Sequence, residues 1–311
     1  MDEIEKVISE YQLAEHAPCI LLRESSDNRV YTAGSTNKKI LRIGKKLSVP
    51  EIHFEHQALR TLEEKAVPVP KLILTKSGDI YVETVEGEVA VMFSFVEGYH
   101  ANFDGEVPIS EHTFTAGATL GMIAKAGEDF IPEHARARTV YSELERALTL
   151  RNEIETSLEG GAQLIEEIKS ILELTKETTS PYGLLHNDFR PGNVFFADPK
   201  TVSGVIDFDW SCMGPLIKDL AHGAMEWSFK DGESAPNQEA FDNFIAGYNS
   251  TAIHSFTDMR EIYLWTTQSA LADTATFFCD RLNTDSTVRK LSSSYMYRKY
   301  LYFSDKYRTL A

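Results

Sequence analysis

The chain has 311 residues, with 31 Lys and Arg against 47 Asp and Glu, which gives a formal net charge of −16. This length exceeds the roughly 100–200 residues of a typical domain, so the chain can form one large domain or two joined lobes. The acidic balance argues against a nucleic-acid-binding protein, because such proteins present concentrated positive charge to the phosphate backbone.

The first hundred residues have the pattern of a small β-sheet. Short apolar and β-branched runs alternate with polar turns, at 18–24, 29–34, 38–44, 71–75, 80–86 and 89–96. Because successive strand side chains point to opposite faces, the third run places Arg42 on the same face as Ile40 and opposite to Leu41.

One helix is predicted among these strands. It runs from Glu51 to about Lys65, because Pro50 suits the first turn of a helix and Pro68 and Pro70 cannot continue one.

After Gly98 the pattern becomes mainly helical. Apolar residues recur at helical spacing around 164–172 and 241–248, and further helices are predicted at 111–126, 138–156, 258–280 and 285–308. Short apolar runs and a Pro-Gly turn interrupt this pattern at 183–210. We therefore expect an α+β fold with a small strand-rich lobe (residues 1–97), a larger mainly helical lobe (residues 98–311) and a ligand cleft between them.

Candidate catalytic residues lie between positions 186 and 209. His186 and Asp188 form an H-x-D motif, Asn193 follows five residues later, and an apolar run then leads to Asp207. Phosphoryl transfer needs a carboxylate that orients the attacking hydroxyl and accepts its proton, and oxygen ligands that hold Mg²⁺ against the phosphates. A tight loop carrying Asp188 and Asn193, facing a second loop carrying Asp207, supplies these groups.

The motifs resemble those of the aminoglycoside phosphotransferase, choline-kinase-like and homoserine kinase type II superfamily, which has a protein-kinase-like bilobal fold. The matching segments are H-N-D with the later Asn, I-D-F-D, Gly-Pro and K-D-L-A, at 186–193, 206–209, 214–215 and 218–221. The resemblance implies that Asp188 is the catalytic base and that Asn193 and Asp207 bind Mg²⁺. It also implies that His186 is a scaffold residue of the catalytic loop and that Asp219 braces this loop from a buried position.

Turn-forming residues at strand ends are the alternative interpretation of Asp188, Asn193 and Asp207, although their joint spacing disfavours it. For Asp209, a contact with a second metal ion and a hydrogen-bonded structural role both remain open, and the structural role is favoured.

The resemblance covers most of residues 20–225 and so extends into the first lobe. It implies that Arg42 contacts the α- and β-phosphates of ATP and that Glu55 is its ion-pair partner. Many relatives have Lys in this strand, but the guanidinium of Arg stays charged and can bind a carboxylate through two hydrogen bonds. An exposed strand Arg with a surface Glu is the alternative.

The turn at 25–28 is a second candidate nucleotide contact. It contains no glycine-rich loop, but its amides and hydroxyls, beginning with Ser25, could cap the phosphates. A plain hairpin turn is the alternative.

The run at 92–96 resembles the inter-lobe hinge of the superfamily. Backbone groups of Ser94 and Val96 would then hydrogen-bond the adenine edge, and Ile40, Met92 and Phe95 would supply apolar walls for the base.

Taken together, the resemblance implies an ATP- and Mg²⁺-dependent kinase of a small-molecule hydroxyl, with an aminoglycoside, choline or a homoserine-like compound as the type of acceptor. A protein Ser/Thr kinase and a nucleotide-binding pseudokinase are the alternatives. A pseudokinase has no need for a catalytic carboxylate, so Asp188 argues against it.

Acidic residues of the second lobe are candidates for binding an amine on the acceptor. They are Glu226, Asp231, Glu233, Asp273 and Asp280. Solvated acidic loops and helix faces are the alternative for each of them.

The sequence also predicts a cytoplasmic protein without a membrane partner. No stretch approaches the roughly 18 apolar residues that span a bilayer, and residues 1–5 lack the features of a secretory signal. Cys19, Cys212 and Cys279 are odd in number and form no C-x-x-C motif, so we expect free thiols rather than a disulfide framework. The oligomeric state stays open.

Overall fold

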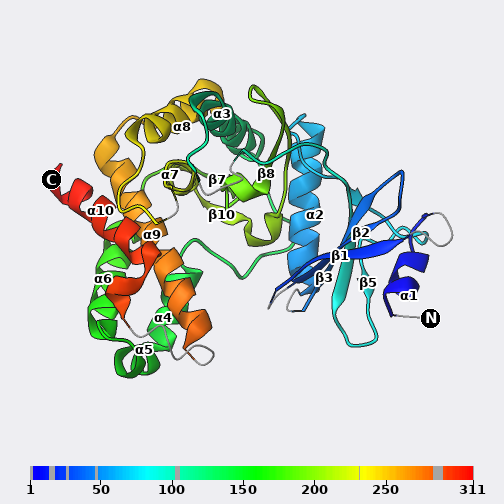
Figure 1. The fold of residues 1–311 in the computed structure, drawn as a ribbon, viewed down its shortest axis with the longest axis horizontal. Helices are drawn as coiled ribbons and strands as arrows, with labels where there is room; N and C mark the ends of the chain where they lie inside the picture. Colours follow the sequence, from blue (N-terminus) through cyan, green and yellow to red (C-terminus); the bar gives the residue numbers. More distant parts are fainter. Residues whose placement is uncertain are drawn as a thin grey trace.

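The computed structural model describes residues 3–13, 18–25, 28–45, 48–101, 106–230, 232–282 and 290–310. They form two lobes joined side by side, a smaller one built on an antiparallel sheet and a larger one that is mainly helical (Figure 1). This is the α+β arrangement of a small antiparallel-sheet lobe and a larger mainly helical lobe that the sequence predicted. The elements of the small lobe are α1 (Glu3–Ser9), β1 (Cys19–Glu24), β2 (Asn28–Ala33), β3 (Lys39–Gly44), α2 (Val49–Glu64), β4 (Leu72–Ile73), β5 (Val82–Glu83) and β6 (Val89–Ser94).

The sheet of the small lobe has the strand order β1-β2-β3-β6-β4, with β5 also paired to β6. Alternation along β3 is as predicted: Leu41 is buried in a core on the face covered by α1, whereas Arg42 points to the opposite face, toward α2. The strands predicted at 71–75 and 80–86 are much shorter, with two residues each. The first is cut short because the Thr75 hydroxyl accepts a hydrogen bond from the Asp79 amide and closes a turn.

Helix α2 lies along the boundary between the sheet and the helical lobe (Figure 1). It begins with a capping box, in which the Ser48 backbone amide and the Glu51 carboxylate are hydrogen-bonded, and Pro50 occupies its first turn as predicted. Phe54 and Glu55 are buried, and they lie on the side of α2 that faces the inter-lobe cleft.

The large lobe contains α3 (Ser110–Ala126), α4 (Ser142–Thr149), α5 (Arg151–Ser157), α6 (Gly161–Lys176), β7 (Tyr182–Leu185), η1 (Pro191–Asn193), β8 (Val194–Asp198), β9 (Thr201–Val205), η2 (Phe208–Trp210), β10 (Cys212–Pro215), α7 (Leu216–Glu226), α8 (Gln238–Thr251), α9 (Met259–Arg281), η3 (Leu291–Ser293) and α10 (Tyr295–Thr309). In the described part of the chain, no helix is long and apolar enough to cross a membrane. Cys19, Cys212 and Cys279 are free thiols.

Two helix predictions in this lobe are partly wrong. The helix predicted at 138–156 is divided into α4 and α5, because Leu150 leaves the helical backbone region (φ −96°, ψ 19°). In the helix predicted at 285–308, positions 285–289 lie outside the described residues, and α10 begins only at Tyr295, after residues 290–294. Its start is set by Ser294, whose hydroxyl accepts a hydrogen bond from the Tyr297 amide, whereas Lys290 just before it is extended and bridges to Glu159.

An aromatic cluster in the large lobe anchors the segment that carries the candidate catalytic residues. Phe189 is fully buried and its ring lies 6.2 Å from that of Trp227 and 6.0 Å from that of Phe244. Phe244 is held there by close packing of α3 on α8, where a Cβ at Gly117 would lie 2.1 Å from the Phe244 carbonyl oxygen. The catalytic segment is therefore attached to the rigid core of the lobe.

Candidate active site

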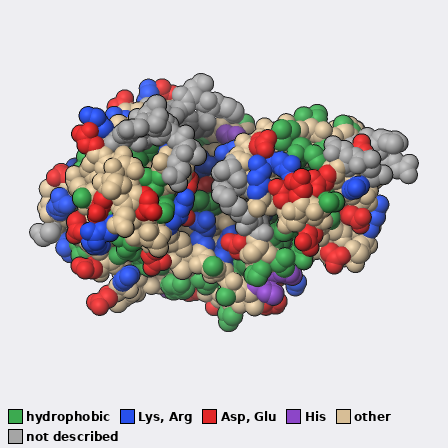
Figure 2. Space-filling view, turned by 90° about the horizontal axis from the view of Figure 1, so that it is seen from below, with side chains coloured by type: hydrophobic (Ala, Val, Ile, Leu, Met, Phe, Trp, Pro, Cys, Tyr) green, Lys and Arg blue, Asp and Glu red, His purple; other side chains and the backbone are tan. Residues whose placement is uncertain are grey.

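A cavity of about 720 Å³ lies between the two lobes. Its walls include Arg42 from the sheet, Asp188 and Asp207 from the two predicted loops, and Asp273 from α9. Figure 2 shows the hollow between the lobes, with Lys and Arg side chains (blue) inside it. The structure thus brings Asp188 and Asp207 of the large lobe and Arg42 of the small lobe to one space.

The loop after β7 is held by buried polar groups. The Asp219 carboxylate accepts hydrogen bonds from the backbone amides of His186 (2.7 Å) and Asn187 (2.8 Å), as the bracing role predicted. Asn187 adopts a left-handed conformation (φ 65°), which Asn tolerates better than most residues. Its side-chain amide donates to the Trp210 carbonyl and its side-chain oxygen accepts from Lys218. The loop is therefore tied both to α7 and to the segment after Asp207.

His186 lies inside this arrangement and does not reach the cavity. Its Nε2 is 3.0 Å from the Ile206 carbonyl, and its Nδ1 accepts a hydrogen bond from the Asp188 amide. Complete burial lowers the pKa of His186 below its ordinary value. A neutral imidazole that donates through Nε2 and accepts through Nδ1 joins the two loops, which is a scaffold role.

Asp188 has one quarter of its side chain exposed to the cavity (25%). Its Oδ2 accepts hydrogen bonds from Asn193 Nδ2 (2.8 Å) and Arg190 Nε (3.2 Å). Burial raises the pKa of Asp188 above its ordinary value, although Arg190 opposes this shift. The two hydrogen bonds fix one oxygen, and the other, Oδ1, lies 3.9 Å from His222 Nε2, which is beyond hydrogen-bond distance.

Asp207 and Asp209 together form a concentration of negative charge across from Asp188. Asp207 is in a left-handed conformation (φ 70°), and burial and the neighbouring Asp209 raise its pKa to about 8. Two carboxylates that hinder each other's ionisation in this way fit a site for a divalent cation, which would remove the repulsion. Asn193 can add a further oxygen, because its Nδ2 donates to Asp188 while its Oδ1 accepts no hydrogen bond from the described residues.

Asp209 also has a structural partner, the Asn28 side-chain amide at 3.1 Å. This bond ties the hairpin between β1 and β2 to the loop that follows Asp207. The hydrogen-bonded role that the sequence favoured for Asp209 is therefore present in the structure.

The predicted partnership of Arg42 and Glu55 is present and buried. Arg42 Nη1 lies 3.0 Å from Glu55 Oε1, and Nη2 bonds the other carboxylate oxygen, so the pair is bidentate. Both side chains are less than a tenth exposed (7% and 4%), so the alternative of an exposed surface pair is wrong. Burial opposes the charge of Arg42, but Glu55 raises its pKa above the ordinary value. Asp209 and Asp207 act in the same direction, which places the guanidinium beside the candidate metal loop.

Ser25 lines the cavity at the turn between β1 and β2. Its amide donates to the Asn28 carbonyl (2.8 Å) and its hydroxyl accepts from the Asn28 amide (3.0 Å), so Ser25 closes a tight hairpin. Positions 26 and 27 of the predicted turn lie outside the described residues.

The hinge residues lie at the end of β6, beyond the lining of this cavity. The Ser94 amide donates to the Lys71 carbonyl, whereas Val96 forms no backbone hydrogen bond with any described residue. Met92 cannot contact the adenine base as predicted, because its side chain is fully buried on the α1 face of the sheet, opposite to Ile40.

Sequence reasoning missed two arginines that hold the loop after Asp207. Arg136 donates to the backbone carbonyls of Phe208 and Asp209 and lies over the Phe54 ring of α2 (5.6 Å). Arg138 stacks on the Trp210 ring at 3.9 Å. Both come from the irregular segment between α3 and α4, where no motif marks them; their contacts depend on residues distant in the chain.

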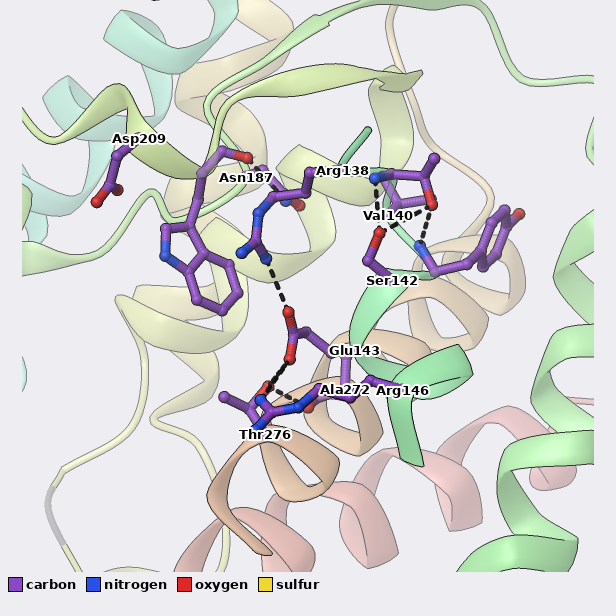
Figure 3. Close-up of polar contacts among 12 residues, drawn as sticks. Arg138, Val140, Ser142, Glu143, Arg146, Asn187, Asp209, Ala272 and Thr276 are labelled. Carbon is purple, nitrogen blue, oxygen red and sulfur yellow. Dashed lines mark hydrogen bonds and ion pairs between the residues drawn. The ribbon is translucent and has the colours of Figure 1, made fainter. Parts of the chain in front are cut away.

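Arg138 also belongs to a polar network on the wall of the cavity. Figure 3 shows the Glu143 carboxylate between Arg138, Arg146 and Thr276, and it lies 2.8 Å from Arg138 Nη1. These charges are therefore paired with each other.

Comparisons with known proteins agree with this geometry. The model of the phosphotransferase enzyme family matches residues 19–259. A curated homoserine kinase of Paramagnetospirillum magneticum is 26% identical over 310 residues, which cover 96% of this chain and 92% of that protein. Among solved structures, an amicoumacin kinase in complex with AMP-PNP, Ca²⁺ and Ami has a TM-score of 0.76 at 15% identity and covers 100% of this chain and 98% of its own. A choline kinase from Cryptosporidium parvum has a TM-score of 0.67 at 13% identity and covers 99% and 95% of the two chains.

Proposed function

Because this chain belongs to the phosphotransferase enzyme family, we propose that it transfers the γ-phosphoryl group of ATP to a hydroxyl of a small molecule of the amino-alcohol or sugar-alcohol type. One observation carries the proposal. Asp188 and Asp207 face one cavity, Asn193 is hydrogen-bonded to Asp188 from behind, and the phosphate-binding candidate Arg42 enters the same cavity from the other lobe.

In this proposal the chain works by positioning the reactants. Asp188, oriented by Asn193 and Arg190, receives the proton of the acceptor hydroxyl and aligns its oxygen with the γ-phosphorus. Arg42, held by Glu55, contacts the α- and β-phosphates.

Asn193 and Asp207 would hold Mg²⁺, which supplies positive charge to the β- and γ-phosphates when bound. The carboxylate pair of Asp207 and Asp209 supports this assignment, because it needs a compensating cation. Further contacts to the nucleotide would come from Ser25, Ser94 and Val96. His186 connects the two loops through its hydrogen bonds to Ile206 and Asp188.

The small-molecule type of acceptor is supported by the names of the relatives, which include homoserine and choline kinases. The cavity also offers both acidic and basic side chains to an acceptor, which suits a polar compound.

The test is ADP release, coupled to a spectroscopic assay, with Mg-ATP and a panel of aminoglycosides, amino alcohols, homoserine and neutral sugars. We expect at least one acceptor to raise ADP release by about 100-fold over the ATP-only rate, as expected for a positioned acceptor compared with water. Omission of the divalent cation should abolish the signal, because the Asp207–Asp209 pair then stays uncompensated.

AMP-PNP binding, followed by thermal shift, is the control for a folded nucleotide site. Nucleotide binding with no transfer to any member of the panel would contradict the proposed acceptor class. Labelled phosphate on protein bands would instead favour a protein kinase.

A further inference from the structure

One face of α9 forms part of the cavity wall. Ser269, Asp273, Thr276 and Asp280 are spaced by three or four residues, so they lie on one side of the helix, and all four line the cavity. This face adjoins α7, which contributes His222, and the loop that carries Asp188.

Two of the five acidic side chains that the sequence nominated for an amine already have a cation. Glu226 is paired with Lys299 at 2.6 Å, and Asp280 is paired with Arg146 at 2.7 Å. Glu233 is exposed and does not line the cavity, and Asp231 lies outside the described residues. The negative charge of Glu143, on the part of the cavity wall shown in Figure 3, is likewise neutralised, because Glu143 forms ion pairs with two arginines.

Asp273 differs from these residues. Its carboxylate forms no hydrogen bond or ion pair with the described part of the chain, yet it lies in the cavity wall. Burial, followed by the nearby Glu226, raises the pKa of Asp273 to about 7, and the charge of Asp188 contributes to this shift. Asp273 and the candidate catalytic base therefore face the same small space.

Two neighbouring side chains are also unsatisfied. The Ser269 hydroxyl and both ring nitrogens of His222 are buried, with residue exposures of 1% and 4%, and none of them has a hydrogen-bond partner among the described residues. Both residues line the cavity. Buried polar groups without partners are costly, so such groups next to a cavity indicate a polar ligand that completes them.

We propose that the acceptor carries an ammonium group that binds to Asp273, while Ser269 and His222 hydrogen-bond polar atoms of the same molecule. The inference rests on the proposed kinase function and refines it: the acceptor is an amino alcohol whose ammonium group and reacting hydroxyl reach Asp273 and Asp188 in the same cavity. The cation is attracted by a carboxylate that forms no ion pair with the described residues, although the charges of Lys299 and Lys218 also act on it, and Asp188 is left for the reacting hydroxyl.

The test compares amino alcohols with their counterparts that lack the amine: homoserine with 4-hydroxybutyrate, ethanolamine with ethylene glycol, and 1-aminopropan-2-ol with propane-1,2-diol. Binding to the protein with Mg-AMP-PNP is measured by calorimetry, and turnover by ADP release. We expect an amine to bind about 30-fold or more tightly than its counterpart, and Asp273→Asn to remove this preference, because the variant leaves the ammonium without its counter-charge.

Asp280→Asn is the matched control, since Asp280 lies on the same helix face and in the same cavity but already has Arg146 as its partner. It should keep the preference for the amine. Equal binding of amine and neutral compound by the wild type, unchanged amine affinity in Asp273→Asn, or no binding of any amine would each overturn the inference. Amine binding that depends on Asp273 without any ADP release would support the inference and contradict the proposed function.

The affinity for the amine should also depend on pH. The groups that face Asp273 are Glu226, Lys218 and His222 of α7, Lys299 of α10 and Asp188. Because burial and Glu226 raise the pKa of Asp273, its carboxylate becomes more ionised as the pH rises, so the wild-type Kd for ethanolamine should fall in a step between pH 6 and pH 8, a range in which the amine stays protonated. Asp273→Asn should show a flat profile. A wild-type profile without this step would overturn the assignment.

Discussion

Asp188→Asn is expected to lower the turnover of the best acceptor by about 1,000-fold, the effect typical of losing a positioned general base. The amide has the shape of the carboxylate and can still accept hydrogen bonds from Asn193 and Arg190, so the loop should keep its conformation. The variant loses the ability to accept the proton. It also loses the negative charge that orients the hydroxyl. The measurement is steady-state ADP release, with AMP-PNP binding followed in parallel.

Asp198→Asn is the control for this substitution. Asp198 is an exposed carboxylate on the neighbouring strand β8, and its described partner is the backbone amide of Lys200, so its loss should leave turnover unchanged. Turnover of the Asp188 variant within about tenfold of wild type would remove Asp188 from the role of base. Loss of AMP-PNP binding would show instead that the carboxylate supports the loop.

Arg42→Met is expected to lower the free energy of unfolding by about 3–5 kcal/mol, because it leaves the Glu55 carboxylate buried without its counter-charge. Glu55→Gln should be destabilising for the converse reason. The double variant should recover much of the loss, since neither charge then remains, and urea denaturation of the four proteins gives the coupling energy directly. The affinity of the double variant for Mg-ATP should nevertheless stay low, because no cationic side chain is left at position 42 for the α- and β-phosphates.

The exposed pair of Lys45 and Glu24, in the same sheet, is the control. Lys45→Met should change stability by less than about 1 kcal/mol. Single variants of Arg42 and Glu55 whose effects add without coupling would contradict the buried pair. Normal nucleotide affinity in the double variant would show that Arg42 and Glu55 do not contribute to nucleotide binding.

The local pattern of the chain was sufficient for β1, β2, β3 and β6, the faces of β3 and the helix after Pro50, but it overestimated the length of β4 and β5 and missed α1. The correctly predicted elements depend on alternation, turn residues and a capping box, which are properties of neighbouring residues. Local pattern failed where a distant contact or a single backbone angle decided the outcome. Leu150 breaks the helix predicted at 138–156, and the late start of α10 follows from the extended backbone at Lys290.

The sequence by itself determined which chemical groups the candidate site contains, because the spacing of Asp188, Asn193 and Asp207 within two short loops is a local property. Only the tertiary structure decided which other charges those groups meet. It buried the expected pair of Arg42 and Glu55, placed Arg136 on the loop after Asp207, and left the Asp273 carboxylate in the cavity wall without an ion pair among the described residues. The reason is physical: whether a charge is neutralised depends on distances between segments far apart in the chain, and only the packing of the two lobes sets those distances.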